Sequence, residues 1–256
     1  MSNRFWVMVN KVIDDANILI LVLDARMVEE TRNDEIESKV KALNKPLIYV
    51  LNKCDLVDKS VMEHYARKLP NSIFISTKNH QGTSKLRQRI MITASRNHLK
   101  SIKVGVLGYP NVGKSSVINA LKGKTSAPSS SMSGYTKHIQ KVRTSSIVLL
   151  DTPGVIPYSD TAHNADAHAK HAMIGSIDYT KEKNPDSIAV ELMKAFPGII
   201  EHHYHVAVNK DGEKTIEDIA LKCNLKAKGN IPDVLRAARM ILKDWQLGKI
   251  THKTEM

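Results

Sequence analysis

The strongest constraint on this chain is a glycine-rich loop between an apolar run and a helical pattern. Residues 108–115 read Gly-Tyr-Pro-Asn-Val-Gly-Lys-Ser, which fits the phosphate-loop pattern G-x-x-x-x-G-K-[ST]. The loop directly follows the strand-like run Val104 to Leu107. Because a strand, this loop and a helix together aim backbone N–H groups at an anion, the motif predicts an α/β fold with a nucleotide phosphate site.

Several residues of this loop have distinct predicted roles. Lys114 is expected to reach the outer phosphates and to act in catalysis, and the hydroxyl of Ser115 is expected to bind Mg²⁺. Four neighbours complete the predicted nucleotide contacts, namely Asn111, Val112, Gly113 and Ser116.

A second motif, Asp-Thr-Pro-Gly at residues 151–154, follows the apolar run Ile147 to Leu150. A carboxylate at that strand end can hold Mg²⁺ through water, so Asp151 is a predicted metal ligand. The N–H of Gly154 is predicted to sense the terminal phosphate. Thr136, in the loop Ser126 to Lys137, is predicted to complete the Mg²⁺ shell and to form a catalytic switch with Gly154, and Thr125 is the alternative.

A third motif, Asn-Lys-Cys-Asp at residues 52–55, predicts the base. Guanine presents two adjacent N–H donors that the Asp55 carboxylate can accept together, whereas adenine offers no such pair. Lys53 is expected to lie over the base plane and Asn52 to tie loops together. The segment Ser76, Thr77 and Lys78 is expected to supply a backbone N–H to the guanine oxygen. These motifs predict GTP and GDP as ligands.

The motifs occur in an unusual order, because the base motif precedes the phosphate loop. All these loops leave the carboxyl ends of strands in one predicted sheet, where ligands bind regardless of chain order. The expected fold is therefore a Ras-like P-loop NTPase domain in circularly permuted order. It should occupy residues 1–177, followed by a small helical RNA- or ribosome-binding domain at 178–256.

The apolar periodicity predicts the elements of both domains. Strands are expected at 17–23, 46–51, 72–75, 102–107, 139–143 and 147–150, with a weaker strand-like alternation at 205–208. Helices are expected at 32–43, 59–68, 83–98, 114–121, 185–195, 215–223 and 232–246.

The permuted order and several longer motifs resemble the circularly permuted GTPases of the YlqF/RbgA family, related to the MMR1/HSR1 group. The resemblance rests on four segments, namely Asp24-Ala25-Arg26, G-Y-P-N-V-G-K-S-S-V-I-N-A-L, D-T-P-G-V and the C-terminal A-A-R-M-I-L-K-D-W-Q-L-G-K-I. The resemblance implies a GTPase that acts in assembly of the large ribosomal subunit, with rRNA contact by the helical domain. The bacterial F-P-G-H-M segment is absent, so its histidine cannot be assigned a role here.

Charge supports a nucleic-acid partner. The net charge is +12, and residues 64–150 hold 15 basic residues and no acidic one. A phosphate pocket needs one or two lysines, so a basic face for rRNA or the ribosome is the better account, with a solvated surface as the alternative. On the last predicted helix, Arg236, Arg239 and Lys243 form a basic stripe opposite Leu235, Ala238, Leu242 and Trp245. Arg26 is predicted either to be structural or to meet RNA.

The sequence also bears on hydrolysis. Val155 follows the glycine of D-T-P-G where many GTPases place a water-orienting Gln, which predicts slow turnover until ribosomal particles stimulate it. Asn111 resembles the asparagine that coordinates K⁺ in related GTPases, which predicts K⁺ stimulation. His163, His168 and His171 are alternative water-orienting residues or a solvated helix face.

Two other functions stay open, namely a guanine-nucleotide-sensing RNA-binding module with little hydrolysis, and a GTPase in tRNA modification. No run of 18 apolar residues and no signal-peptide pattern occurs, and the two cysteines, Cys54 and Cys223, are far apart. We therefore expect a cytoplasmic protein without membrane contact, monomeric in solution.

Overall fold

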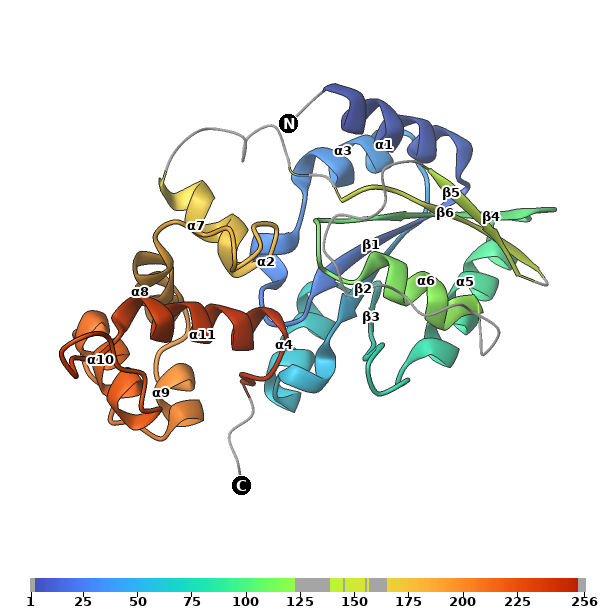
Figure 1. Ribbon diagram of the computed structural model, residues 1–256. Helices are drawn as coiled ribbons and strands as arrows, with labels where there is room; N and C mark the ends of the chain where they lie inside the picture. The colour runs from blue at the N-terminus through green and yellow to red at the C-terminus, as the bar shows by residue number, and fades with distance from the viewer. Residues whose placement is uncertain (1–2, 123–138, 145, 155, 157–164, 253–256) are drawn as a thin grey trace. The chain divides into compact units, whose positions relative to one another are not determined.

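The computed structural model describes residues 3–122, 139–144, 146–154, 156 and 165–252. Its first compact unit spans residues 1–162 and holds a six-stranded sheet of order β3-β2-β1-β4-β6-β5 (Figure 1). Neighbouring strands are parallel except at one edge, where β5 runs antiparallel to β6. The strands are β1 (Ile18–Asp24), β2 (Leu47–Asn52), β3 (Ser72–Phe74), β4 (Ile102–Leu107), β5 (Gln140–Arg143) and β6 (Ile147–Asp151).

Helices cover both faces of this sheet. In Figure 1, α1 and α3 lie on one side of the strands, and α5 and α6 lie on the other. A parallel sheet covered in this way needs strands that are apolar on both faces, and all seven residues of β1 are buried. The helical elements of this unit are α1 (Asn3–Asp15), α2 (Val28–Thr31), α3 (Asp34–Ala42), the short 3₁₀ helix η1 (Cys54–Leu56), α4 (Lys59–Lys68), α5 (Thr83–Arg96) and α6 (Lys114–Lys122).

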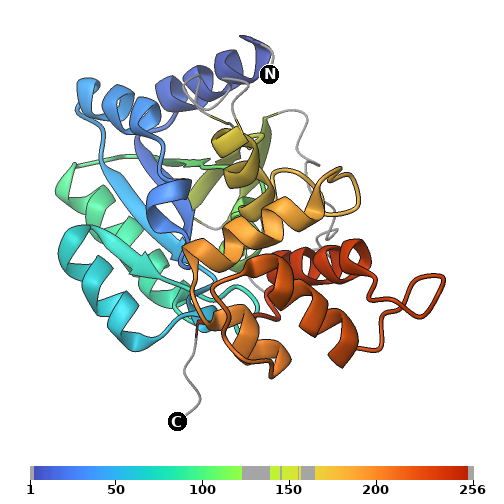
Figure 2. The ribbon, with the colours of Figure 1, turned by 90° about the vertical axis from the view of Figure 1, so that its left-hand side faces the viewer.

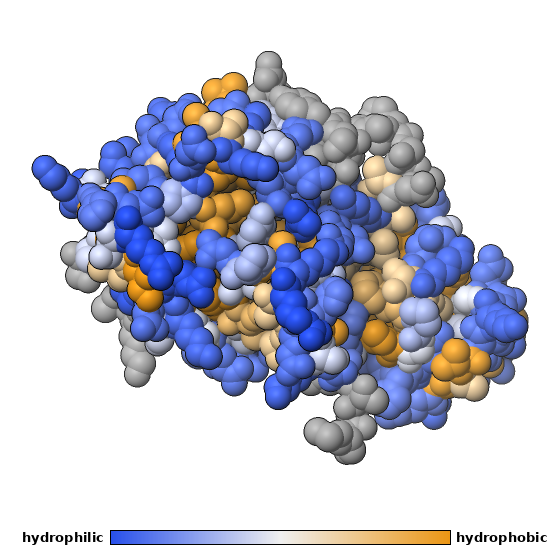
Figure 3. Space-filling view, turned by 180° about the vertical axis from the view of Figure 1, so that it is seen from behind, coloured by the Kyte–Doolittle hydropathy of each residue, from blue (hydrophilic) through white to orange (hydrophobic). Residues whose placement is uncertain are grey.

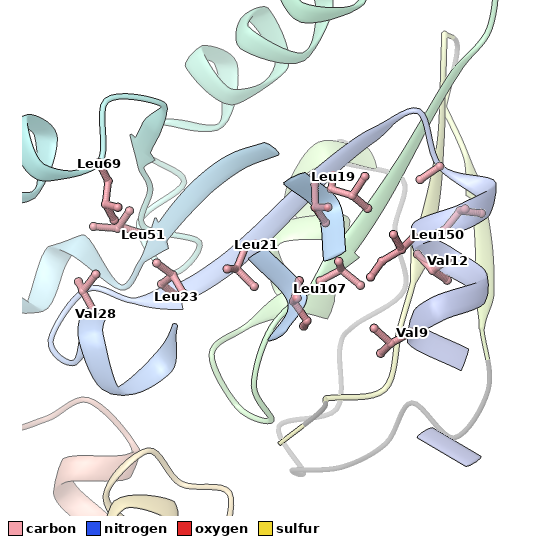
Figure 4. Packing of buried hydrophobic residues seen from close by; sticks show 14 of the residues in the cluster. Val9, Val12, Leu19, Leu21, Leu23, Val28, Leu51, Leu69, Leu107 and Leu150 are labelled. Atoms are coloured by element: carbon pink, nitrogen blue, oxygen red, sulfur yellow. The ribbon is translucent and has the colours of Figure 1, made fainter. Parts of the chain in front are cut away.

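The core under α1 shows how the strand period builds the sheet. Leu19, Leu21 and Leu23 alternate along β1 and point to the face that also receives Val9 and Val12 of α1 (Figure 4). Burial of such side chains stabilises the fold by about 1.5–3 kcal/mol each. This packing fixes β1 at the centre of the sheet, between β2 and β4, and so fixes where the loops at the strand ends emerge.

The second compact unit spans residues 163–256, and its described part is helical (Figure 2). Helix α11 packs against α7, α8 and α10. Trp245 of α11 is fully buried, and its Nε1 donates to the carbonyl oxygen of Met173 at 2.8 Å. The helices are α7 (Ala165–Met173), α8 (Pro185–Ala195), α9 (Ile199–Tyr204), α10 (Gly212–Lys222) and α11 (Val234–Gln246).

The observed elements agree with most of the predicted ones. All six main strands are present, and the bounds of α4 and α8 are those expected. The strand-like alternation at 205–208 is not a strand. His205 takes a left-handed conformation with φ 54° at the end of α9, and Val208 is 70% exposed. The predicted boundary at residue 178 lies after α7, whereas the second unit includes α7 because that helix packs on α8 and α11.

Among the described residues, no helix combines the length and the apolar character that a membrane crossing would require.

Candidate nucleotide site

The phosphate loop joins β4 to α6, as the sequence predicts. Its backbone enters regions that most side chains avoid, with φ 142° at Gly108 and 97° at Gly113. A Cβ atom on Gly108 would collide with the carbonyl oxygen of Val22, and one on Gly113 would collide with the side-chain amide of Asn52. Asn111 is also left-handed, with φ 63°, and is half-buried. Glycine is therefore required at both ends of the loop.

Lys114 opens α6 and turns its side chain back into the loop. Its Nζ donates to the carbonyl oxygens of Gly108 at 3.1 Å and Tyr109 at 2.5 Å, and the residue is only 7% exposed. Burial lowers the pKa of Lys114 to about 8, although the nearby Asp151 carboxylate works against this shift. An ammonium placed in this way can exchange carbonyl contacts for phosphate oxygens.

Two of the predicted Mg²⁺ ligands lie within contact of each other. The hydroxyl of Ser115 donates to Oδ2 of Asp151 at 3.2 Å, from the first turn of α6 to the end of β6. Asp151 pairs in register with Val106 of the neighbouring strand β4, and Thr152 donates to the carbonyl oxygen of Val106 at 2.7 Å. A hydroxyl and a carboxylate oxygen are the donor types that Mg²⁺ prefers, so these residues fit the ion.

Gly154 lies directly against the phosphate loop. A Cβ atom there would come within 2.5 Å of the N and Cα atoms of Pro110. The D-T-P-G segment can therefore approach the phosphate loop this closely only because this position has no side chain.

Asn52, the last residue of β2, links three loops. Its side-chain Nδ2 donates to the carbonyl oxygen of Val112 at 2.9 Å. Its Oδ1 accepts from the N–H and the hydroxyl of Thr77, at 3.3 and 3.2 Å. The base motif, the phosphate loop and the Ser76–Lys78 loop are thus joined through one buried side chain, which is the tie expected from the sequence.

The remaining predicted base-site residues lie around this tie. Asp55 is half-buried in η1, and Lys53 precedes it with a left-handed φ of 62°. Ser76 is buried, and its hydroxyl accepts from the N–H of Asn79 at 3.1 Å. Lys78 is exposed, Ser116 is half-buried and Val112 is buried. Thr125, Thr136, Val155 and His163 lie outside the described residues.

Sequence reasoning left Asp24 out of the site. This buried carboxylate ends β1 and accepts from Lys53 Nζ at 2.7 Å and from Arg26 Nη2 at 2.8 Å. The Arg26 side chain is 1% exposed, so the structural reading of that residue holds. The sequence did contain a signal for Asp24, because it is a charged residue directly after six apolar strand residues.

One expectation for the second unit changes. Ala238, Leu242 and Trp245 are buried in α11, but Leu235 is 50% exposed and belongs with the exposed basic residues of that helix. Nε2 of His168, on α7, lies 2.9 Å from Oε2 of Glu182, and the water-orienting role of this histidine stays a prediction.

A phosphate loop after β4, a D-x-x-G segment after β6 and a base motif after β2 meet at the carboxyl ends of one sheet, although the base motif comes first in the chain. This arrangement defines a P-loop GTPase fold in circularly permuted order. Residues 103–221 match the family model MMR_HSR1, described as a 50S ribosome-binding GTPase. Residues 103–221 are therefore similar to the GTPase domain that this family model describes.

Solved structures support the same fold. The GNP-bound YlqF of T. maritima matches with a TM-score of 0.69 at 24% identity, over 98% of this chain and 96% of that one. The GDP-bound form matches with a TM-score of 0.69 at 22% identity, over 95% of both chains. The resemblance to the YlqF group and the predicted fold class are confirmed.

Curated relatives extend the similarity. A GTP-binding protein of Methanocaldococcus jannaschii is 40% identical over 95% of this chain, which spans 65% of that protein. Nucleolar GTP-binding protein 2 of Saccharomyces cerevisiae is 34% identical over 97% of this chain, which spans 52% of it. The chain thus spans about half to two thirds of these relatives.

Proposed function

We propose that this protein binds GTP with Mg²⁺, hydrolyses it, and uses the cycle in assembly of the large ribosomal subunit. The observation that carries the proposal is the Asn52 side chain, which joins the base motif, the phosphate loop and the Ser76–Lys78 loop. A pocket that binds a phosphate chain and a purine at once needs these loops in one place.

The bases are distinguished by Asp55. Asp55 is half-buried in η1, three residues after Asn52. A carboxylate can accept both N–H donors of guanine, while adenine would leave it partly desolvated and without donors. Discrimination of about 10⁴ is typical of sites built in this way.

The phosphate loop and the end of β6 would hold the metal and the phosphates. Ser115 and Asp151, 3.2 Å apart, would hold Mg²⁺, and Thr136 would complete its shell in the GTP state. When bound, the ion neutralises charge on the outer phosphates. Lys114 adds a second positive charge, and the N–H groups of Asn111 to Ser116 surround the phosphate chain.

Hydrolysis is proposed to be slow in the isolated protein. Val155 has no group that can orient water, so ribosomal particles would complete the catalytic arrangement. The left-handed Asn111 is proposed to coordinate K⁺ beside the phosphates. Turnover should then be faster in KCl than in NaCl when large subunits are present. Asn111→Ala should remove this difference. Equal rates for the wild type in the two salts would contradict a role of K⁺.

Basic surfaces are proposed to bind rRNA. Most of the face in Figure 3 is hydrophilic. One set of exposed basic side chains lies on α5, between α5 and β4, at the start of β4, at the end of α6 and on β5, and a second set lies on α11. The first set is Lys85, Arg96, Lys100, Lys103, Lys122, Lys141 and Arg143; the second is Arg236, Arg239 and Lys243. The relatives' names, which include nucleolar GTP-binding protein 2, agree with this partner.

Two assays separate this proposal from its alternatives. Turnover that rises with purified large subunits supports an assembly GTPase, whereas a nucleotide sensor would show no rise. The protein should co-sediment with large subunits in the presence of a non-hydrolysable GTP analogue but not of GDP. This co-sedimentation should weaken steeply as the salt concentration rises. A tRNA-modifying GTPase would sediment with neither form. We also propose that the protein acts as a cytoplasmic monomer, which gel filtration and imaging of a tagged chain would check.

A further inference from the structure

The end of β1 carries a buried charge cluster that the proposed chemistry of the phosphates does not use. Oδ2 of Asp24 accepts from Lys53 Nζ at 2.7 Å, while Arg26 donates from Nε to Oδ1 at 3.1 Å and from Nη2 to Oδ2 at 2.8 Å. The Asp24 and Arg26 side chains are each 1% exposed, whereas Lys53 is 22% exposed. Only the lysine of this cluster can reach a ligand.

We propose that Asp24 and Arg26 are positioning residues for guanine recognition, which hold the Lys53 side chain along the face where the base binds. This inference rests on the proposed GTP site. It assigns a role to the Asp24-Ala25-Arg26 segment.

The backbone around Lys53 is already fixed from both sides. Asp24 and Asn52 are register partners of β1 and β2, and the N–H of Ala25 donates to the carbonyl oxygen of Asn52 at 2.8 Å. After Lys53, the N–H of Cys54 donates to the carbonyl oxygen of Ile75 at 3.1 Å. These backbone bonds do not fix the direction of the long Lys53 side chain. Holding that side chain in one position costs rotamer entropy.

Asp24 supplies that direction. Its carboxylate accepts from Nζ at the end of the Lys53 side chain at 2.7 Å, so that end of the side chain is held in one place. Arg26 makes the carboxylate a rigid acceptor, because a guanidinium fork binds both oxygens in one plane. Lys53 is then ordered before the nucleotide arrives, and binding loses less side-chain entropy.

The electrostatics agree with this geometry. Burial alone would raise the pKa of Asp24, yet Arg26 and Lys53 hold it well below its usual range. Burial lowers the pKa of Lys53, and the Asp24 carboxylate opposes that shift. The carboxylate thus stays ionised and helps the partly exposed Lys53 ammonium to keep its charge.

A double-mutant cycle tests the proposal. Affinities for GDP and for inorganic tripolyphosphate are measured by calorimetry in the wild type, Asp24→Asn, Lys53→Met and the double variant. Asp24→Asn should weaken GDP binding by about tenfold and leave tripolyphosphate binding within about twofold. In the Lys53→Met background, Asp24→Asn should cause no further loss, because its effect acts through the lysine.

Equal losses from Asp24→Asn with and without Lys53, or equal losses for both ligands, would show a merely structural role and overturn the proposal. A wild type that binds no GDP would instead overturn the proposed function. Since Asp24→Asn leaves the buried Arg26 without an ionised partner and can prevent folding, Arg26→Lys is the second variant. This variant keeps the positive charge but loses the two-pronged guanidinium contact, and it should weaken GDP binding only when Lys53 is present. The same loss of affinity with Lys53 and in the Lys53→Met background would contradict the proposal. Lys59→Met, which breaks an exposed ion pair with Glu63, is the control.

Discussion

Asn52 donates a hydrogen bond of 2.9 Å to the carbonyl oxygen of Val112, although the two residues lie 60 positions apart. The bond joins the end of β2 to the phosphate loop that follows β4, across the end of the central strand β1. It depends on which strand ends lie close together in the sheet and not on the order of the strands in the chain. A circularly permuted chain can therefore keep the site intact.

Asn52→Ala removes this tie. The carbonyl oxygen of Val112 and both donors of Thr77 lose their partner, which should lower the free energy of unfolding by about 1–3 kcal/mol. GDP affinity should fall as well, by about tenfold or more, because two loops lose their common support. Thermal unfolding and calorimetry measure both effects. Asn97→Ala, which removes an exposed hydrogen bond at the end of α5, should change neither; an Asn52→Ala protein that behaved like this control would contradict the tie.

Gly113→Ala and Gly229→Ala form a matched pair. Both glycines have a positive φ, 97° and 88°, so both variants should lose about 1–2 kcal/mol of stability from backbone strain. Only the Gly113 variant adds a methyl group that collides with Asn52, while nothing lies within 4 Å of the added atom at Gly229. GDP binding should be lost in the first and kept in the second. Similar affinities in the two variants would mean that the loop does not need the close approach to Asn52.

Much of this architecture could be predicted because its signals are local. Eight consecutive residues or fewer are enough to recognise the phosphate loop, the base motif or an apolar strand. The missed helix α1 shows the limit. Its segment is rich in β-branched and aromatic residues, whose helix propensity is weak, and packing of Trp6, Val9 and Val12 on the core decides the conformation.

The role of Asp24 could not be derived for a related reason. Its partners Arg26 and Lys53 are 2 and 29 positions away, and only the pairing of β1 with β2 brings the second one close. The short helix α9 and the turn at His205 likewise depend on tertiary packing. A four-residue alternation such as 205–208 carries too little information to separate a strand from a helix end.

Lys114 should give nucleotide binding a proton linkage. Its pKa is lowered to about 8 from an ordinary 10.5, so the unfolded chain binds more protons than the folded one between these values, and stability of the nucleotide-free protein should rise with pH across that window. Phosphate binding favours the charged form and reverses the shift. At pH 8, GDP binding should therefore take up about half a proton.

Calorimetry in buffers of different ionisation enthalpy measures this uptake. It should fall toward zero near pH 7, where Lys114 is already charged, and Lys103→Met, which alters an exposed lysine at the start of β4, should leave it unchanged. An uptake independent of pH between 7 and 8 would contradict the assignment of the linkage to Lys114.

Asp151→Asn tests the metal site. The amide keeps the shape of the side chain but loses the charge beside Ser115, so the Mg²⁺ affinity of the nucleotide complex should fall by about 10–100-fold. The readout is the ratio of GTP affinity with Mg²⁺ to that with EDTA, which should be large in the wild type and close to one in the variant. Asp186→Asn, in the first turn of α8, is the control. An unchanged ratio in the Asp151 variant would place the ion elsewhere.

The central claim is a purine site that combines the phosphate loop with Asp55. Titration calorimetry of the purified protein with GDP, ADP and XDP, repeated with Asp55→Asn, tests it most directly. The wild type should bind GDP more tightly than ADP by about 10³-fold or more. In Asp55→Asn the preference should move toward XDP, because the xanthine oxygen can accept from the new amide. A wild type that bound ADP as well as GDP, or neither, would contradict the account.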